Sequence, residues 1–293
     1  MNHPAIRHGA SAVITGASVG IGFAIADRLA QEGMNLILLD NNAATLAHAK
    51  QLLLTKYPER VLRTVCADVA SDQGRIAIND AVEELGSLAL LVNNAGILGK
   101  SALECAGPWH DTLHWRHIME VNFWAVLELQ SLLVPRLIEQ GTPAAVINLG
   151  SKEGITTPPG NAAYSVSKAA IKVLTEQLAH ELREPKASHV SAHLLIPGYT
   201  FTPMNFPQVD FLALDNEHSA KPAAPWSAAQ VVQRLLDGLS RREFYIFCED
   251  NEVTTELDQR RMQWSADDMI LGRPALSRWH PDYVDRFNQY IAR

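Results

Sequence analysis

The sequence has little of what marks secreted, nucleic-acid-binding or membrane-spanning proteins. Its three cysteines, Cys66, Cys105 and Cys248, are far apart and odd in number, which favours reduced thiols over disulfides and fits no metal-ligand spacing. A formal net charge of −7 offers no basic surface to a phosphate backbone. The chain shows no unbroken apolar run of about eighteen residues, and its start lacks a signal-peptide pattern. We therefore expect a cytoplasmic protein that binds neither nucleic acid nor a membrane.

What the sequence does contain is a regular alternation of short apolar strands and amphipathic helices. Apolar residues make up 47% of the 293 residues, enough for a large core. Predicted strands cover residues 11–15, 35–40, 61–66, 89–92, 144–149, 190–196 and 243–248. The alternation predicts a single α/β domain with a doubly wound parallel sheet and helices on both faces. Ligands of such sheets bind beyond the carboxyl ends of the strands.

A glycine-rich turn joins the first predicted strand to the first predicted helix. Glycine lets a backbone turn tightly and approach a pyrophosphate, which amide groups at a helix N-terminus then bind. The residues of this turn that we expect at a dinucleotide are Gly16, Ser18, Val19, Gly20, Ile21 and Gly22. A tight loop without a ligand is the alternative.

The second predicted strand ends in an acidic residue, Asp40. A carboxylate at this point can accept hydrogen bonds from both hydroxyl groups of an adenosine ribose, and it would repel the 2′-phosphate of NADP. Asn41 and Asn42 follow, and Val19 lies in the glycine turn, so neither segment offers a cation for that phosphate. We therefore predict NAD as the cofactor. The alternative role for Asp40 is a cap on the helix over residues 43–56.

Two further strand ends suit the same ligand. Asp68 and Val69 follow the third strand, where the carboxylate could bond an adenine amino group or serve as a turn or cap residue. Asn94, Ala95 and Gly96 follow the fourth strand, where small residues permit close approach of the backbone to a ligand or a neighbouring strand. We predict that both segments line the cofactor site.

Tyr164 and Lys168 are four positions apart, so a helix would place both side chains on one face. Tyrosine titrates near ~10 and is a poor base at neutral pH unless a positive charge stabilises its phenolate. Lys168 could supply that charge and make Tyr164 an acid/base. This short spacing also occurs on ordinary helix surfaces, so the interpretation depends on the rest of the chain.

Several motifs together resemble the classical short-chain dehydrogenase/reductase family. They are T-G-A-S-V-G-I-G from Thr15, N-N-A-G from Asn93, Asn122, Ser151, Y-S-V-S-K from Tyr164, and Pro197-Gly198, in the order and spacing of that family. The resemblance covers roughly residues 10–248 and implies a Rossmann-like fold. It also implies hydride exchange between a nicotinamide and a carbon that bears a hydroxyl or carbonyl group.

The resemblance implies a role for each catalytic residue. Tyr164 would be the general acid/base, and Lys168 would lower its pKa and bind the nicotinamide ribose. Ser151 would hydrogen-bond the substrate oxygen as charge develops. Asn122 would anchor a water molecule that links Lys168 to solvent, although a lone asparagine in a helix is otherwise typical of a polar face.

The segment after the sixth strand is expected to contact both cofactor and substrate. In the family, Pro197 and Gly198 precede a threonine near the nicotinamide amide, a place that Thr202 occupies, with Thr200 as a possible substitute. The loop over residues 198–226 is rich in aromatic residues and proline, which suits a substrate lid with an apolar inner face; a surface loop packed on the core is the alternative. We infer a bulky or apolar alcohol or ketone as substrate.

Two other groups of residues have simpler interpretations. Lys152 and Glu153 follow Ser151 and could face the pocket, but we expect a solvated pair. The spacing of His110, His114 and His117 could hold a metal, but an obvious further ligand is missing and the implied reaction needs none, so we predict a surface stripe.

Residues 251–293 extend beyond the point where family members commonly end, so we divide the chain into a dinucleotide-binding domain over residues 1–250 and a C-terminal extension. Two helices are predicted in the extension, around residues 254–270 and 281–291, with too many apolar anchors for a disordered tail. The extension could pack on its own domain, contact a neighbouring subunit or cover the substrate opening. Family members are often tetramers, and we expect a homo-oligomer, either a dimer or a tetramer.

The sequence thus predicts an NAD(H)-dependent oxidoreductase that interconverts a secondary alcohol and a ketone. A dinucleotide-binding regulator or scaffold that kept the fold without turnover is the alternative from another class. Loss of Tyr164, Lys168 or Ser151 would favour that alternative, and all three are present.

Overall fold

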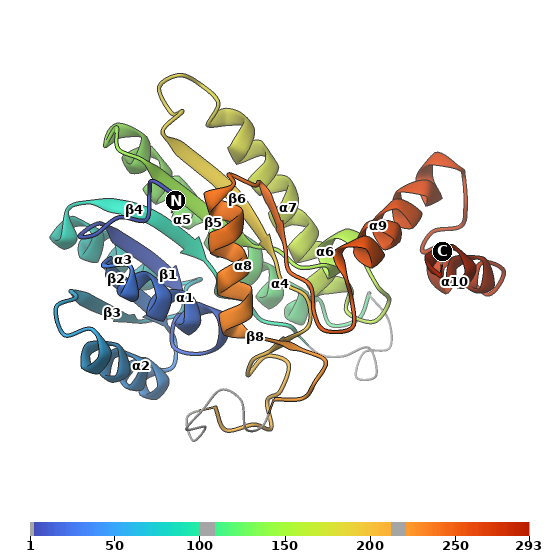
Figure 1. Ribbon diagram of the computed structural model, residues 1–293, viewed down its shortest axis with the longest axis horizontal. Helices are drawn as coiled ribbons and strands as arrows, with labels where there is room; N and C mark the ends of the chain where they lie inside the picture. The colour runs from blue at the N-terminus through green and yellow to red at the C-terminus, as the bar shows by residue number, and fades with distance from the viewer. Residues whose placement is uncertain (1–2, 100–108, 212–220, 293) are drawn as a thin grey trace.

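A seven-stranded parallel sheet forms the centre of the protein (Figure 1). The computed structural model describes residues 3–99, 109–211 and 221–292. The strands are β1 (Ser11–Thr15), β2 (Asn35–Asp40), β3 (Leu62–Cys66), β4 (Leu88–Asn93), β5 (Ala144–Leu149), β6 (Val190–Ile196) and β9 (Tyr245–Phe247). Their order is β3-β2-β1-β4-β5-β6-β9, and each neighbouring pair is parallel. The predicted Rossmann-like α/β fold is confirmed.

The sheet is buried on both faces because successive strand residues point to opposite sides. Val13 and Ile37 belong to the core on one face, whereas Ile14 and Leu38 belong to the core on the other. All four side chains are fully buried. Two buried faces explain why the strands appear in the sequence as continuous apolar runs.

Helices cover both faces of the sheet. Each helical connection brings the chain back across the sheet, so that the next strand runs parallel to the others. One face carries α1 (Gly20–Gln31), α2 (Ala43–Lys56) and α8 (Ala228–Ser240), and the other carries α3 (Asp72–Leu85), α5 (Ala125–Glu139) and α7 (Ala162–Glu181). α8 begins with the predicted capping box between Ser227 and Gln230. Because all the strands are parallel, the loops after β1, β2, β4, β5 and β6 meet at one edge.

One long helical segment departs from regular geometry. The helix predicted over residues 114–139 runs as α4 (Thr112–Met119), a π-helical turn (Glu120–Trp124) and α5. The whole segment, Thr112–Glu139, is long and apolar enough to cross a membrane by length and composition, although charged residues interrupt its apolar run. Half of the most apolar stretch of this segment is buried, and α5 contributes to the core. Packing on the sheet therefore explains its apolar character.

The C-terminal extension forms a helical arm at the side of the sheet, and Figure 1 shows α10 away from the strands. The arm consists of α9 (Thr255–Ile270), a 3-10 turn (Ser277–Trp279) and α10 (Val284–Ile291). Trp264 is buried, its ring contacts Phe287 and Tyr290, and its indole nitrogen donates to the Ser277 hydroxyl at 2.8 Å. The two predicted helices are therefore present, with α10 starting later than expected, and they share a small core of their own.

Two buried histidines meet beside β6. The rings of His3 and His193 are perpendicular with centroids 5.5 Å apart, and the Ser191 hydroxyl lies 3.2 Å and 2.9 Å from their Nε2 atoms. The Nδ1 atom of His3 accepts a hydrogen bond from the Ala5 amide at 3.2 Å. Burial, the neighbouring His193 and then Arg242 lower the pKa of His3 to about 4. The fold therefore requires a neutral imidazole at this position.

This buried imidazole predicts a loss of stability in mild acid. The pKa of His3 is about 4 in the folded protein and near ~6.5 in an unfolded chain, so between these values the unfolded state binds more protons. His3 should leave the free energy of unfolding unchanged above pH ~6.5 and reduce it by about 3 kcal/mol as the pH falls toward the folded value. Urea unfolding at several pH values would measure this in wild type, in His3→Gln and in the exposed control His180→Gln. The same acid sensitivity in His3→Gln would contradict the assignment.

Candidate active site

A cavity of about 800 Å³ lies at the carboxyl ends of the strands. The predicted site residues that line it are Gly16, Val19, Gly20, Ile21, Asp40, Asp68, Val69, Asn94, Ala95, Gly96, Ser151, Tyr164, Lys168, Pro197, Gly198, Thr200 and Thr202. The remaining three predicted residues, Ser18, Gly22 and Asn122, do not line the cavity themselves but contact residues that do. Residues from distant parts of the sequence are thus brought to one cavity.

The glycine turn packs tightly against the loop after β4. A Cβ atom at Gly22 would lie 2.0 Å from the Gly16 carbonyl oxygen and 2.5 Å from Asn94 Nδ2, so no larger residue fits. Asn94 Nδ2 donates to the carbonyl oxygens of Thr15 and Gly16, each at 2.8 Å. No side chain caps the start of α1 at Val19. An uncapped helix N-terminus behind a glycine turn fits the pyrophosphate of a dinucleotide.

Asp40 lies at the end of β2 and does not cap the following helix. Asn42 is the N-cap of α2, where its side chain accepts hydrogen bonds from the amides of Ala44 and Thr45. The Asp40 carboxylate accepts hydrogen bonds from the Ser18 hydroxyl at 2.7 Å and the Ser18 amide at 3.1 Å. The capping alternative is therefore wrong, and Asp40 fastens the glycine turn to β2 while it lines the cavity.

Asp68 is both a turn residue and a cavity residue. Its Oδ1 atom accepts a hydrogen bond from the Ala70 amide at 2.9 Å, as aspartate does in turns. Ser71, rather than Asp68, caps α3. Asp68 and Val69 both line the cavity, so the turn places them where a cofactor contact was predicted.

Ser151, Tyr164 and Lys168 converge beyond the end of β5. Ser151 follows that strand, and Tyr164 and Lys168 lie near the start of α7. The Ser151 hydroxyl lies close enough to the Tyr164 phenol to lower the pKa of that group. Lys168 Nζ lies 5.6 Å from the centre of the Tyr164 ring and donates to the Leu149 carbonyl at 2.9 Å. A hydroxyl, a phenol and an ammonium are thereby positioned for proton transfer to a substrate oxygen.

Burial dominates the protonation of this group. It raises the pKa of Tyr164 to about 12, an effect that the nearby Ser151 hydroxyl opposes and the Glu153 carboxylate reinforces. Burial also lowers the pKa of Lys168 to about 8. The expected net lowering of the Tyr164 pKa is not what this geometry gives, because desolvation of the phenolate outweighs the polar contacts. A neutral phenol is suited to donate its proton to a carbonyl oxygen.

Asn122 lies in the π-helical turn and is 1% exposed, so it is not part of a polar helix face. Its Oδ1 accepts a hydrogen bond from the Ile97 amide at 2.8 Å, and its Nδ2 donates to the Ile97 carbonyl at 2.9 Å and the Ser167 hydroxyl at 3.0 Å. A Cβ atom at Gly96 would lie 3.3 Å from Asn122 Oδ1 and 3.5 Å from Lys168 Nζ. The π turn, a feature frequent at functional sites, thus brings Asn122 close to Lys168.

The described part of the loop over residues 198–226 has features of both a substrate lid and a surface loop packed on the core. Its ends pair as two short strands, β7 (Thr200–Phe201) and β8 (Trp226–Ser227). Tyr199 and Met204 line the cavity, whereas the buried rings of Phe201 and Phe206 pack on each other at 4.9 Å. Residues 212–220 lie outside the described part of the chain.

Sequence reasoning missed several residues of the cavity wall. They are Leu39, Asn41, Ala67, Ile97, Leu98, Gly99, His117, Val121, Leu149, Gly150, Pro203 and Asn205. Most flank a predicted motif, so extending each motif by a few residues beyond its strand end would have found them. Those on α4 and in the π turn, such as His117 and Val121, had no such signal.

Lys152 does not form a solvated pair with Glu153. Its Nζ lies 2.5 Å from Asp258 Oδ2 in α9, and the Lys152 side chain is only 19% exposed. Glu153 lines the cavity, and burial raises the pKa of its carboxyl group. No local sequence pattern could predict this contact, because Lys152 and Asp258 are far apart in the sequence.

Histidines and cysteines form no metal site in the described part of the chain. Within residues 3–99, 109–211 and 221–292, no three histidine, cysteine, aspartate or glutamate side chains are arranged to hold a metal ion. Cys66 and Cys248 are free thiols, and Cys105 lies outside the described residues.

The motifs and the geometry agree with comparisons to known proteins. Residues 10–211 match the family model of short chain dehydrogenases. The chain belongs to the short-chain dehydrogenase/reductase family. A relative in this family, the 1-deoxy-11-beta-hydroxypentalenate dehydrogenase of Streptomyces exfoliatus, is 30% identical over 256 residues, which are 87% of this chain and 88% of the relative.

Other members of the short-chain dehydrogenase/reductase family use either nicotinamide dinucleotide. The NADP-dependent (R)-specific alcohol dehydrogenase of Lentilactobacillus kefiri is 30% identical over 197 residues, 67% of this chain and 75% of that protein. The crystal structure of a short-chain dehydrogenase/reductase from Burkholderia phymatum in complex with NAD has a TM-score of 0.76 and 28% identity, covering 91% of this chain and 96% of that one. The protein is thus an oxidoreductase of a nicotinamide-dinucleotide family.

The buried lysine predicts the pH dependence of ketone reduction by this short-chain dehydrogenase/reductase. Burial lowers the pKa of Lys168 to about 8, while Tyr164 stays protonated until about 12. We expect the Lys168 ammonium to stabilise the phenolate left when Tyr164 gives up its proton, and this charge would disappear as the pH rises through the Lys168 pKa. For an accepted ketone, kcat/KM should be flat at neutral pH and fall by about tenfold per unit well above the Lys168 pKa.

Lys168→Arg provides the control for this profile because arginine keeps its charge throughout the range. The variant should be slower at neutral pH but flat where the wild type declines. A wild-type rate of reduction that rises through the same range would contradict the role of Lys168.

Proposed function

We propose that the protein is an NAD(H)-dependent oxidoreductase that interconverts a secondary alcohol and a ketone. The observation that carries the proposal is the convergence of Ser151, Tyr164 and Lys168 in the same cavity as the glycine turn and Asp40. The turn and the uncapped start of α1 fit a dinucleotide. Bound there, the nicotinamide would supply or accept the hydride.

The chain's own residues would move the proton. In reduction, the Tyr164 phenol donates its proton to the carbonyl oxygen while the Ser151 hydroxyl bonds the same oxygen. The Lys168 ammonium stabilises the phenolate that forms. Asn122, whose side chain approaches Lys168 near Gly96, would anchor the water molecule through which the proton is replaced. Oxidation of an alcohol would use the same groups in reverse.

The remaining cofactor contacts follow from position around the cavity. Asp68 and Val69, after β3, would contact the adenine, and Asn94, Ala95 and Gly96, after β4, would lie along the dinucleotide. The segment that begins at the end of β6 would contact the nicotinamide. Its predicted contacts are Pro197, Gly198, Thr200 and Thr202.

The charge of the cavity supports NAD rather than NADP. Asp40 lines the wall beside the glycine turn, where a carboxylate would repel a 2′-phosphate. Lys152 and Lys168 are the only lysines or arginines among the described lining residues. Lys152 is paired with Asp258 and Lys168 with the Leu149 carbonyl. The described wall therefore offers no free cation to a 2′-phosphate.

Replacing Asp40 by asparagine should weaken the preference for NAD. Asparagine keeps an oxygen that can accept the hydrogen bonds from Ser18 but removes the negative charge. We expect wild type to use NAD with the higher kcat/KM and Asp40→Asn to lose about tenfold of that ratio, equivalent to about 1.4 kcal/mol. Asp68→Asn is the matched control, since it should affect both cofactors alike. A wild-type preference for NADP would overturn the proposal.

Apolar side chains on the cavity wall support a bulky or apolar substrate. Ile97, Leu98 and Val121 line the cavity together with Tyr199 and Met204 of the substrate loop. Tyr199 and Met204 are 45% and 40% exposed, so a substrate that covered them would bury a substantial apolar area. The relative named for a hydroxypentalenate is consistent with a hydroxylated substrate of this kind.

Tyr164→Phe tests the mechanism directly. The substitution removes the hydroxyl that transfers the proton, so turnover of an accepted alcohol or ketone should fall by about 10²- to 10⁴-fold. NADH binding, measured by fluorescence titration, should remain close to that of wild type. Tyr199→Phe makes the same chemical change on the cavity wall and should keep most of the activity. Turnover by Tyr164→Phe near the wild-type level would refute the assigned role.

A non-catalytic dinucleotide-binding regulator or scaffold is the alternative function. It would be favoured if wild type bound NADH but oxidised or reduced no member of a broad panel of alcohols and ketones. The cytoplasmic location, the assembly into a dimer or tetramer and the domain boundary near residue 250 stay predictions.

A further inference from the structure

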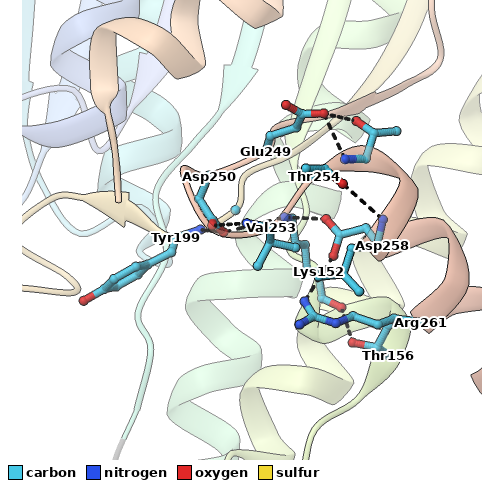
Figure 2. A network of polar contacts seen from close by, with 12 residues as sticks. Lys152, Thr156, Tyr199, Glu249, Asp250, Val253, Thr254, Asp258 and Arg261 are labelled. Atoms are coloured by element: carbon cyan, nitrogen blue, oxygen red, sulfur yellow. Dashed lines mark hydrogen bonds and ion pairs between the residues drawn. The ribbon is translucent and has the colours of Figure 1, made fainter. Parts of the chain in front are cut away.

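Lys152 lies where three strand ends meet the C-terminal extension (Figure 2). It follows Ser151 beyond β5, and its Nζ lies 2.5 Å from Asp258 Oδ2 in α9 and 3.9 Å from Asp250 Oδ2 beyond β9. A Cβ atom at Gly198, beyond β6, would lie 2.9 Å from the same nitrogen. The ammonium group of Lys152, a residue of the loop after β5, therefore lies beside the loop after β6 and pairs with the C-terminal extension.

This ion pair is shielded from water. The side chains of Lys152, Asp258 and Asp250 are 19%, 10% and 7% exposed. Exposed ion pairs contribute little because water and salt screen them. A shielded pair is different, since removal of Lys152 leaves Asp258 with Arg261 at 3.5 Å, and removal of Asp258 leaves Lys152 with Asp250 at 3.9 Å, so the remaining charge loses its nearest partner in a site with little water. The contact is therefore able to hold two segments in a fixed relation.

The direction of α9 is fixed by side chains at its start. Glu249 Oε1 accepts hydrogen bonds from the Thr255 amide at 2.9 Å and the Thr255 hydroxyl at 2.5 Å. Asp250 Oδ1 accepts a hydrogen bond from the Val253 amide at 2.8 Å, and Thr254 is the N-cap of α9. These contacts place Asp258, one turn into the helix, toward Lys152, as Figure 2 shows.

The segment that follows Ser151 is held from two sides, by α7 on one side and by the Lys152–Asp258 pair on the other. A Cβ atom at Gly154 would lie 2.5 Å from the carbonyl carbon of Lys168 in α7, so this segment packs closely on that helix. Ser151 is followed by α6 (Glu153–Thr156), a helix of a single turn, which is too short to be stable by itself. Ser151 Oγ accepts a hydrogen bond from the Glu153 amide at 3.1 Å, and the Ser151 carbonyl accepts one from the Gly154 amide at 3.1 Å. The position of the Ser151 hydroxyl is therefore linked to the position of Lys152 and α6.

We propose that Lys152 and Asp258 are positioning residues through which the C-terminal extension holds the Ser151 loop against Tyr164. The inference rests on the proposed oxidoreductase function and gives the extension a part in it. Polar contacts at the base of α9 join the extension to the catalytic loop, while Trp264 and its neighbours hold the rest of the arm together. Neither Lys152 nor Asp258 contacts a reacting atom; both act through Ser151.

Hydrogen exchange tests the positioning without any need for turnover. Asp258→Asn keeps the size of the side chain and removes its charge, and the matched control Asp267→Asn makes the same change on α9 at a residue whose partners are Gln263 and Arg273. Amides of Glu153 and Gly154 should exchange at least about tenfold faster in Asp258→Asn and at the wild-type rate in Asp267→Asn. Equal exchange in the two variants would overturn the proposal.

Kinetics then show whether the displaced loop affects the reaction. Asp258→Asn should reduce kcat by about ten- to a hundredfold, as small misplacements of catalytic groups do, and leave the Kd for NADH unchanged. Lys152→Met should have a similar effect, and the double variant should be little worse than either single one because both remove the same interaction. Thermal unfolding would confirm that each variant is folded.

The possible outcomes separate the two proposals. Additive effects of the two substitutions, or a kcat of Asp258→Asn equal to that of Asp267→Asn, would refute a positioning role while the oxidoreductase function stands. If wild type itself turned over no alcohol or ketone, the proposed function would fail, and hydrogen exchange alone would still decide whether Asp258 orders the Ser151 loop.

Discussion

The hydrogen bonds from Asn94 Nδ2 to the carbonyl groups of Thr15 and Gly16 join the ends of the neighbouring strands β1 and β4, and the site is built outward from this contact. The same Gly16 carbonyl sets the distance at which Gly22 brings α1 toward the sheet. On the other side, the loop after β4 continues to Ile97, which holds Asn122 by hydrogen bonds in both directions. The glycine turn and Asn122 are thus both held by the segment that follows β4. A displacement of this segment would disturb both the proposed cofactor site and the proposed proton-transfer site.

Burial has the largest effect on the protonation of Tyr164 and Lys168. It raises the pKa of Tyr164 and lowers the pKa of Lys168, so in each case it favours the neutral form. The two shifts separate proton affinities that are nearly equal in water, since the pKa of Tyr164 rises to about 12 and that of Lys168 falls to about 8, so the phenol holds its proton more tightly than Lys168 does. The Leu149 carbonyl accepts a hydrogen bond from the Lys168 ammonium, and the Ser151 hydroxyl partly offsets the rise in the pKa of the phenol. The fold therefore tunes this group by removing water rather than by adding charge.

The sequence predicted the parts of the site that depend on local chemistry. Strand ends, the glycine turn and the Tyr164–Lys168 spacing follow from periodicity and residue type, and parallel topology brings them together. The features that the sequence did not predict depend on competition between hydrogen-bonding partners or on contacts between residues far apart in the sequence. Asn42 takes the cap that Asp40 could have made, because the Asp40 carboxylate is bonded to Ser18. The π turn at Asn122 arises from tertiary contacts with the loop after β4, for which no propensity exists.

The helices of the C-terminal extension could be predicted from the sequence, but the place where the extension attaches to the rest of the protein could not. Its apolar residues predicted a packed structure, and Trp264, Phe287 and Tyr290 form a core within the extension itself, whereas Ile270 and Leu271 are exposed. Those residues therefore could not reveal where the extension attaches. The attachment is polar, through Glu249, Asp250 and Asp258. Apolar contacts are non-directional and would tolerate sliding of α9, whereas hydrogen bonds and a shielded ion pair fix its angle and its distance. An attachment of this kind suits an element whose task is to hold Ser151 in place.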